Sequence, residues 1–364
     1  MAATSTERPS KPVASARLAW VDIAKGICIL LVVMMHSTLG TGGAMGGEGF
    51  LHTAVAFAKP FRIPDFFLLS GLFLGRVIDR EWRLFADRRL VHFAYFYVLW
   101  VVIQSLAKYG QIVDGAGPEA FLAHLATALV EPYSTLWFIY LLAVFSVVTK
   151  LLRPVPQPLL FLAAAFIQIV PVTTSSTLVE EFCARYVWFV AGFVFADRIF
   201  AFAGFVRRHP ISALAGLALW AVIDGALAFT PSSLASYQTL ASLPGVSMIL
   251  GGAGALAIVA VASLLTGVGG PLTDALRQSG ERSIVIYLSF FLPMAATRMA
   301  LVKTGILTDI GWASLVVMLT AATAPLVLER VIRHTPLAFL FRRPPAFSIV
   351  RRNPTSLDTA LQAT

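Results

Sequence analysis

Long apolar runs of about 17–25 residues recur along the whole chain, and each is long enough to cross a bilayer as a helix. Short polar segments with Gly, Pro and charged residues separate the runs. We predict about ten membrane helices, at 19–39, 51–76, 89–109, 133–151, 157–174, 182–201, 210–229, 245–267, 283–302 and 310–331. The pattern therefore predicts an all-α fold, a polytopic membrane bundle.

The second run, 51–76, is interrupted by two prolines and three charged residues: Lys59, Pro60, Arg62, Pro64 and Asp65. Proline removes an amide donor and clashes with the carbonyl one turn back, so we expect this helix to be kinked or broken at Pro60 and Pro64. Broken helices at membrane depth occur where the backbone lines a cavity or is covered by protein. The alternative is that 51–64 is partly an outer loop with solvated charges.

The composition supports a membrane protein, because 58% of the 364 residues are hydrophobic and only 13% are charged. Soluble domains are about half apolar and about a quarter charged. The formal net charge of +9 would suggest nucleic acid for a soluble protein. Here it reflects basic loops beside a membrane, so we expect membrane lipid and no nucleic acid as a partner. Cys28 and Cys183 both lie in apolar runs and predict neither a disulfide framework nor a metal site.

Lys and Arg are distributed unevenly between the two sides of the predicted bundle. Most of the 28 fall in loops on the side that holds the N-terminus, whereas the opposite loops hold Lys108, Arg298 and Lys303. Because cytoplasmic loops carry an excess of Lys and Arg, we expect both termini in the cytoplasm and an even number of spans. The expected regions are a cytoplasmic tail at 1–16, a membrane domain at 17–331 and a basic, disordered cytoplasmic tail at 332–364.

The first run carries polar residues that are costly inside a bilayer: Asp22, Lys25 and His36. Lys25 and His36 are eleven positions apart, which on a helix puts them within about 20° of the same face and about 16 Å apart along it. Asp22 and Lys25 are three positions apart and can pair. Two interpretations of His36 stay open: a functional histidine, or a structural one bonded to a neighbouring helix backbone.

Further charged residues are candidates for contact with an anionic ligand. Arg80 and Arg83 lie three positions apart in the first predicted cytoplasmic loop, where they suit a phosphate-binding surface or simply reflect the excess of cytoplasmic Arg. Three more cations lie inside predicted spans: Lys59, Arg62 and Arg185. Arg185 also has the spacing to pair with Glu181. Asp224 has no local partner and is a candidate to pair with one of the buried cations.

Several short motifs occur in order along the chain: the Asp22, Lys25 and His36 set, Pro64-Asp65-Phe66-Phe67-Leu68-Leu69-Ser70-Gly71, Arg80-Glu81-Trp82-Arg83, Leu136-Trp137-Phe138, and Ser283-Ile284-Val285-Ile286-Tyr287-Leu288-Ser289-Phe290. In these motifs and their order the chain resembles the membrane acyltransferase 3 family, the O-acyltransferases of bacterial envelope and exported glycans. Ser70 matches the family's Phe-Phe-x-x-Ser-Gly, and Tyr287 matches its Ser-x-x-x-Tyr-Leu-x-His. The chain departs from the family at Lys25, which is usually Arg, and at Phe290, which is usually His.

The resemblance implies a multi-pass protein of the bacterial inner membrane that transfers an acyl group, acetyl in particular, without a metal. The donor would be a cytoplasmic acyl-CoA such as acetyl-CoA, and the acceptor a hydroxyl of a carbohydrate or lipid-linked glycan. A hydroxyl is a poor nucleophile and needs a base, and neutral His36 suits that role. An acyl-imidazole on His36 is the mechanistic alternative.

The resemblance also suggests roles for the other candidates. Lys25 would contact the donor or hold Asp22, and Arg80 and Arg83 would bind the CoA phosphates. One of Lys59, Arg62 and Arg185 would stabilise the oxyanion or bind an anionic acceptor. Ser70 and Tyr287 would contribute to substrate binding.

Two other classes of protein fit some of these features. A transporter or flippase of an anionic or glycan substrate would also carry intramembrane charges and a broken helix, although the chain shows no internal repeat and a single intramembrane histidine of this kind. A sensor with a degenerate site is a third interpretation, which the departures at Lys25 and Phe290 keep open. Release of CoA by the purified protein would separate an enzyme from a transporter.

Overall fold

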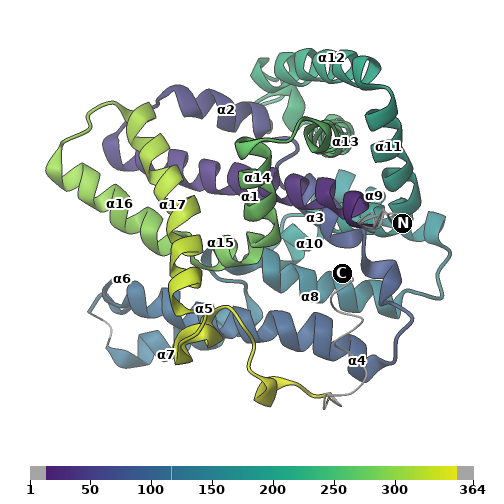
Figure 1. Cartoon of the computed structure of the whole chain (residues 1–364). Coiled ribbons are helices and arrows are strands. Elements are labelled where there is room, and N and C mark those ends of the chain that lie inside the picture. The colour runs from purple at the N-terminus through teal and green to yellow at the C-terminus, as the bar shows by residue number, and fades with distance from the viewer. Residues whose placement is uncertain (1–13, 116, 351–364) are drawn as a thin grey trace, which may run out of the picture.

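The computed structural model of the chain describes residues 14–115 and 117–350, and within them every regular element is a helix (Figure 1). The first half contains α1 (Ala14–Met45), α2 (Phe50–Ala58), α3 (Pro64–Gly71), α4 (Trp82–Ala86), α5 (His92–Ala107), α6 (Tyr109–Val113), α7 (Pro118–Val130), α8 (Trp137–Leu151) and α9 (Gln157–Ile169). The second half contains α10 (Thr177–Val194), α11 (Ala196–Arg208), α12 (Pro210–Phe229), α13 (Pro244–Val268), α14 (Pro271–Glu281), α15 (Ser283–Ser289), α16 (Phe291–Thr304) and α17 (Ile310–Ile332).

Short helices of other pitch join these elements. A π-helix, η2 (Asp87–Val91), joins α4 to α5 without a break. The remaining ones are 3₁₀-helices: η1 (Leu74–Arg76), η3 (Ser134–Leu136), η4 (Leu240–Ser242), η5 (Pro336–Leu340) and η6 (Pro345–Phe347). The all-helical prediction is therefore confirmed for the described residues.

Local sequence explains where many of the helices begin. Proline occupies the first helical position of α3, α7, α12, α13 and α14, where its missing amide proton costs nothing. Ser176 and Asp309 cap α10 and α17, each accepting a hydrogen bond from a backbone amide three residues on. The paired glycines Gly269 and Gly270, both with positive φ, separate α13 from α14.

Six helical segments among the described residues are long and apolar enough to cross a membrane, or eight if each of two bent helix pairs forms one span. The bent pairs are α10 with α11, at 73°, and α15 with α16, at 52°. The count of about ten predicted from the sequence is thus not reached, because two predicted spans are realised as shorter helices. The 51–76 run forms α2 and α3, of nine and eight residues, and the 157–174 run forms α9, of 13 residues, which ends two residues before Pro171.

The break predicted in the second run is present, since residues 59–63 form turns between α2 and α3. Because α2 is a helix, the alternative of an outer loop at 51–64 applies only to these few residues. Small residues let other elements close on the break. A Cβ at Gly71 would lie 2.1 Å from the carbonyl oxygen of Phe189, and a Cβ at Gly254 would lie 2.2 Å from the Cβ of Phe61.

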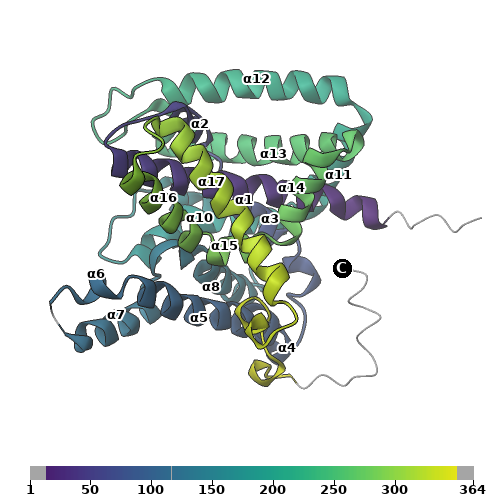
Figure 2. The same ribbon diagram turned by 60° about the vertical axis from the view of Figure 1, so that its left-hand side comes forward.

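Helix α1 runs through the middle of the molecule, as Figures 1 and 2 show from two directions. It packs against α14 and α17 most extensively, and also against α13, α2 and α3. Helix α12 lies on one outer side of the bundle, and α5, α6 and α7 lie on the other. The polar positions of α1 are therefore enclosed by several helices that come from distant parts of the sequence.

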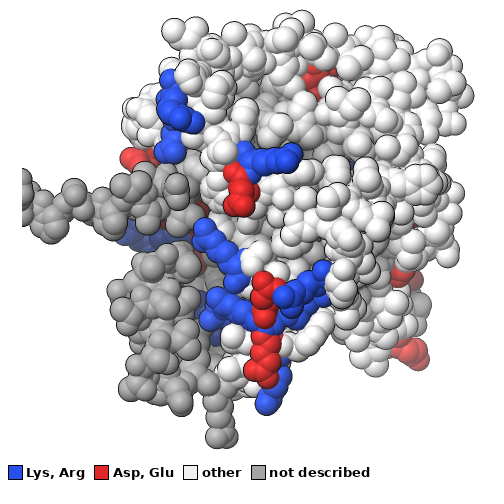
Figure 3. Space-filling view, turned by 90° about the vertical axis from the view of Figure 1, so that its right-hand side faces the viewer, with Lys and Arg blue, Asp and Glu red and all other residues white. Residues whose placement is uncertain are grey.

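Basic side chains gather on part of the face at which α1 begins, next to the grey chain ends in Figure 3. Several of them are paired there. Arg153 lies 2.6 Å from Asp79. The buried ammonium of Lys150 donates hydrogen bonds to the carbonyls of Ile78 and Arg80, at 2.6 and 2.7 Å. We call this part of the molecule the basic end. Which side of the membrane it faces stays a prediction.

The expectation of a disordered tail from residue 332 is wrong for residues 333–350, which pack against the start of α5. The Arg343 guanidinium donates to the backbone oxygen of Asp87 at 2.8 Å and to its carboxylate at 2.7 Å. The Ile349 amide and the Ser348 hydroxyl donate to the same carboxylate. The Trp100 indole donates to the Leu340 carbonyl. Aromatic and hydrogen-bonding partners thus order a basic segment whose composition alone suggests disorder. The predicted tails at 1–16 and 351–364 lie outside the described residues apart from the start of α1.

Candidate active site

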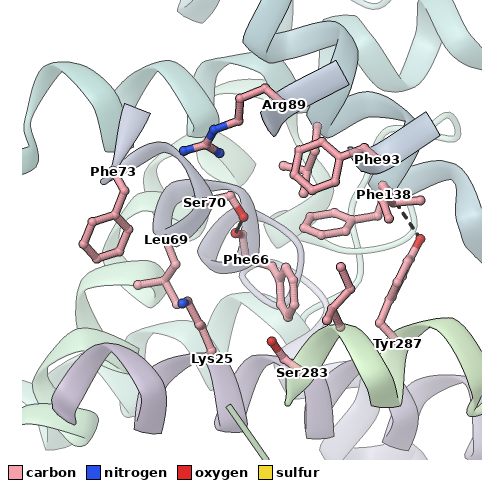
Figure 4. A pocket seen from close by; sticks show the side chains of 13 residues that line it. Lys25, Phe66, Leu69, Ser70, Phe73, Arg89, Phe93, Phe138, Ser283 and Tyr287 are labelled. Carbon is pink, nitrogen blue, oxygen red and sulfur yellow. Dashed lines mark hydrogen bonds between the residues drawn. The ribbon is translucent and has the colours of Figure 1, made fainter. Parts of the chain in front are cut away.

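Lys25 lines a cavity of about 310 Å³ near the basic end (Figure 4). The Lys25 ammonium lies 3.9 Å from the Asp22 carboxylate, which confirms the predicted pair. The polar lining residues are Lys25, Ser70, Arg89, Ser283 and Tyr287, and the rest of the lining is apolar or aromatic. The cavity therefore combines two cations and hydroxyl groups with a largely apolar wall.

Arg89 is the cavity residue that the sequence did not single out. It lies in η2, and in Figure 4 its guanidinium reaches into the cavity from the side opposite Lys25. A π-helix places side chains at angles that a regular α-helix does not, and such irregularities occur often at functional sites. The sequence signal available was only that Arg89 is the first residue of the predicted third span, where it reads as one more Arg at the cytoplasmic boundary.

His36 lines a second, smaller cavity of about 70 Å³, one to three helical turns further along α1. The wall of this cavity is mainly apolar, and Thr135, Trp137 and Tyr287 are its other residues with a polar group. The ring of Phe290 lies 5.5 Å from the His36 imidazole, centre to centre. Phe290 lies at the bend between α15 and α16. The residue at which the chain departs from the usual histidine is therefore a direct neighbour of His36.

Three aromatic residues line both cavities: Phe66, Phe138 and Tyr287. The Phe66 and Phe138 rings meet edge to face with their centres 4.6 Å apart, and the Phe138 and Tyr287 centres are 5.5 Å apart. We call these three side chains the aromatic partition. The predicted alignment of Lys25 and His36 on one side of α1 is therefore realised in two adjacent cavities with the aromatic partition between them.

Tyr287 is fixed in the aromatic partition by its hydroxyl. It donates to the Thr135 carbonyl at 2.5 Å and accepts from the Ile139 amide at 3.4 Å. Ser134, directly before Thr135, has a left-handed φ of 54°, which is uncommon for a residue other than glycine. These hydrogen bonds tie η3 and the start of α8 to α15 through Tyr287, which lines both cavities.

Among the predicted intramembrane cations, only Arg62 lies near His36, where its charge acts on the imidazole. Its guanidinium donates to the Val55 carbonyl at 3.2 Å, and the charges of Arg185 and Asp65 act on it in turn. Arg185 pairs with Glu181 at 3.0 Å, as its spacing predicts. Lys59 instead donates to the side chain of Gln238 and lines neither cavity.

Arg80 and Arg83 do not share a helical face, because α4 begins at Trp82 and Arg80 lies before it. Neither residue lines either cavity. Arg80 is nevertheless close enough for its charge to act on Arg89. A cation of the loop therefore lies near a cation that lines the Lys25 cavity. Asp224 is fully buried, and its carboxylate has no hydrogen-bond or ion-pair partner among the described residues, so the expected pairing with a buried cation is not formed.

Taken together, the fold and the two cavities define a multi-pass helical membrane protein with a cation-lined cavity beside a histidine-lined one. The acyltransferase domain of the acyltransferase 3 family matches residues 18–328. The chain therefore belongs to this family, and the membership implies a membrane acyltransferase that uses an acyl donor and an acceptor.

A curated relative is the inner membrane protein YcfT of Escherichia coli (strain K12), which is 30% identical over 162 residues. The alignment covers 38% of this chain and 45% of the relative, so the chain spans less than half of the relative's length. No solved structure matches the chain.

Proposed function

We propose that the chain is an integral-membrane O-acyltransferase that moves an acetyl group from a cytoplasmic acyl-CoA to a hydroxyl of a carbohydrate or glycolipid. The observation that carries this proposal is the position of His36 in a cavity that shares the aromatic partition with the Lys25 cavity. A donor in one cavity and an acceptor in the other would meet at that partition. Family membership supplies the reaction class.

The Lys25 cavity suits the acyl-pantetheine arm of the donor. Its wall is mostly apolar and aromatic, which matches an extended thioester chain, and Lys25 and Arg89 offer cations to its polar end. A whole CoA is larger than this cavity, so its nucleotide would stay at the basic end. Arg80 and Arg83 would hold the phosphates there, because guanidinium groups match phosphate geometry.

The chemistry needs a base at the far side of the partition. Neutral His36 accepts the proton of the acceptor hydroxyl while the oxygen attacks the thioester carbonyl. The nearby charge of Arg62 stabilises the developing oxyanion. When the carbon–sulfur bond breaks, the thiolate takes the proton back from His36, so CoA leaves as a thiol and no proton is gained or lost. An acyl-imidazole on His36 would reach the same products in two steps.

We infer an inner-membrane location with both termini in the cytoplasm. The excess of Lys and Arg at the basic end supports this orientation. The relative from Escherichia coli is named as an inner membrane protein. In this orientation the donor cavity opens toward the cytoplasmic pool of acyl-CoA, and His36 lies in the outer half of α1.

The test is release of CoA from acetyl-CoA by the purified full chain, with His36→Ala as the decisive variant. Wild-type protein is expected to release CoA slowly to water and faster with an acceptor. His36→Ala is expected to lower turnover by about 100-fold or more, the range for loss of a general base. A transporter would release no CoA.

The matched control is His209→Ala, which removes an exposed imidazole that lies against Phe205 and lines neither cavity. Its turnover is expected to equal that of the wild type. Wild-type turnover in His36→Ala would make His36 a structural histidine and would remove the basis of the proposed mechanism.

A further inference from the structure

Helices α1 and α5 both finish at the end of the molecule opposite the basic end (Figure 1). Two basic side chains belong to this region, and the charge of one acts on the other. Lys108 follows the last residue of α5, and Arg298 belongs to α16; both are half-buried. Burial, and then the nearby charge of Arg298, lower the pKa of the Lys108 ammonium. Like charges at short range repel in a partly desolvated setting, so this arrangement is costly without a compensating anion.

No described carboxylate lies within ion-pair distance of either Lys108 or Arg298. Many of the other cations do have such a partner: Lys25 pairs with Asp22, Arg185 with Glu181, Arg153 with Asp79, Arg277 with Asp274, Arg333 with Glu329 and Arg343 with Asp87. Lys108 and Arg298 are therefore two half-buried cations, and the charge that acts on Lys108 is that of Arg298. Such an arrangement is typical of a site that receives an anion from outside the chain.

Both side chains are held in place by neutral groups. The Lys108 ammonium lies 4.3 Å from the centre of the Phe291 ring and 5.3 Å from that of Tyr133. It also lies 3.5 Å from the Ser134 hydroxyl. The Arg298 guanidinium rests against Gly40, with its Nη1 only 2.2 Å from where a Cβ would be. Rings and a hydroxyl orient these cations without neutralising them.

The same contacts connect the cation pair to His36. Gly40, under Arg298, is one helical turn beyond His36 on α1. Phe291, under Lys108, follows Phe290, whose ring lies 5.5 Å from the imidazole. Ser134, which lies next to the Lys108 ammonium, directly precedes Thr135, and Thr135 lines the His36 cavity. The cations therefore contact residues close to His36, Phe290 and Thr135 in the sequence, although neither cation lines the His36 cavity itself.

Polar groups without partners occur beside this site. The Thr135 hydroxyl oxygen is buried in the wall of the His36 cavity and has no hydrogen-bond partner in the described chain. Gln104, one turn before Lys108 on α5, is fully buried, and both ends of its amide are likewise unpaired there. Buried polar groups are usually hydrogen-bonded, so unpaired ones next to two cations indicate that a polar ligand completes the site.

We propose that Lys108 and Arg298 bind a carboxylate or phosphate of the acceptor, which makes the acceptor an acidic glycan. The anionic group would sit between the ammonium and the guanidinium, and a neighbouring hydroxyl of the same glycan would enter the His36 cavity. This inference rests on the proposed function for the direction of transfer. The anion site itself rests on the geometry of the cation pair, and it is tested without a donor.

The experiment measures binding of acidic sugars to the purified full chain in nanodiscs made only of phosphatidylcholine. The probes are glucuronate for a carboxylate, glucose 1-phosphate for a phosphate, and methyl glucoside as the neutral sugar. At least one acidic probe is expected to raise the melting temperature and to bind about tenfold or more tightly than the neutral sugar. Double substitution Lys108→Gln with Arg298→Gln is expected to abolish this difference, and Lys108→Arg is expected to keep it.

The matched control is Lys303→Gln, which removes a cation from the exposed last turn of α16 and is expected to bind like the wild type. Equal binding of acidic and neutral sugars, or undiminished acidic binding in the double variant, would overturn the proposal. A second set of nanodiscs contains phosphatidylglycerol. If this lipid stabilises the protein through the same two residues and acidic sugars do not displace it, the site belongs to a lipid headgroup and the acceptor assignment is wrong.

Because no CoA is present, this result is independent of the CoA-release test. If the wild-type protein binds acidic sugars selectively but releases no CoA, the proposed enzyme activity is rejected and the anion site is kept. If it releases CoA but does not bind acidic sugars selectively, the anion site is rejected and the enzyme activity is kept.

Discussion

Arg89 lines the Lys25 cavity from η2, the π-helix that interrupts the α-helical register between α4 and α5. It lines the cavity together with Lys25. Two cations that lie 64 positions apart in the sequence thus line one largely apolar cavity. Lys25 and Arg89 are the two cations among the residues that line this cavity.

We expect Arg89→Gln to raise the KM for acetyl-CoA more than it lowers kcat. A cation that holds the donor far from the reacting carbonyl contributes equally in the ground and transition states, so its loss changes KM rather than kcat. The increase should be about tenfold, from loss of one charge-assisted contact. Steady-state CoA release in membranes matched for protein amount provides the measurement.

Arg208→Gln serves as the control, since this exposed guanidinium bonds only within α11 and lines neither cavity. An unchanged donor KM in Arg89→Gln would mean that Arg89 does not touch the donor, and would leave the phosphates to Arg80 and Arg83.

At the residue scale, contacts set by local spacing were predictable and contacts set by tertiary packing were not. The Asp22–Lys25 and Glu181–Arg185 pairs follow from positions three and four apart on a helix. The neighbours of Lys59 and Arg80 depend on where loops lie, and the sequence does not encode that in any local pattern. Arg89 was missed for a different reason, since a π-helix has no hydropathy signature that separates it from an α-helix.

At the scale of elements, the C-terminal segment 333–350 and η2 form one unit. Asp87 opens η2, and its side chain receives hydrogen bonds from Arg343, Ser348 and Ile349. Because Arg89 lies two residues further on, the segment braces the backbone from which Arg89 enters the cavity. The segment 333–350 thereby supports a cavity whose lining residues extend from Lys25 to Tyr287 in the sequence.

We expect Asp87→Ala to destabilise the protein by about 3 kcal/mol, because it leaves the largely buried Arg343 guanidinium without its carboxylate partner. Both side chains are well shielded, at 8% and 12% exposure. The donor KM should rise as well, since Arg89 loses its brace. Melting temperature in detergent and steady-state kinetics measure the two effects.

The comparison variant is Asp79→Ala, which removes the partner of Arg153 from an exposed pair. Pairs of this kind contribute little, so its melting temperature should stay near that of the wild type. Equal melting temperatures for both variants would show that the C-terminal segment does not stabilise η2.

Element prediction succeeded where prolines and long apolar runs dominate, and failed where packing decides. Pro60 and Pro64 mark the break between α2 and α3, and the uninterrupted run of α13 gave its span directly. The bends at Phe195 and Phe290 have weaker markers: Asp197 and Arg198 follow the first, and a single proline, Pro293, follows the second. The docking of residues 333–350 depends on partners such as Trp100 that lie more than 200 positions away.

At the scale of the whole molecule, the uneven distribution of Lys and Arg predicts on which side of the membrane each loop lies. We expect a cysteine at Ser236, in the exposed segment between α12 and α13, to react with a membrane-impermeant thiol reagent in intact cells. A cysteine at Arg208 is expected to react only after the membrane is opened. The background carries Cys28→Ser and Cys183→Ser. The reverse pattern of labelling would invert the topology and move the donor cavity to the outer side.

The aromatic partition also bears on electrical insulation. A continuous water-filled passage from Arg89 to His36 would connect the two faces of the bilayer and let ions run down the membrane potential. With the rings of Phe66 and Phe138 only 4.6 Å apart and Tyr287 tied to the Thr135 carbonyl, hydrated ions meet an apolar plug. A neutral acyl group needs no hydration shell. Under the proposed reaction the protein passes acetyl groups from one side to the other while it remains an insulator.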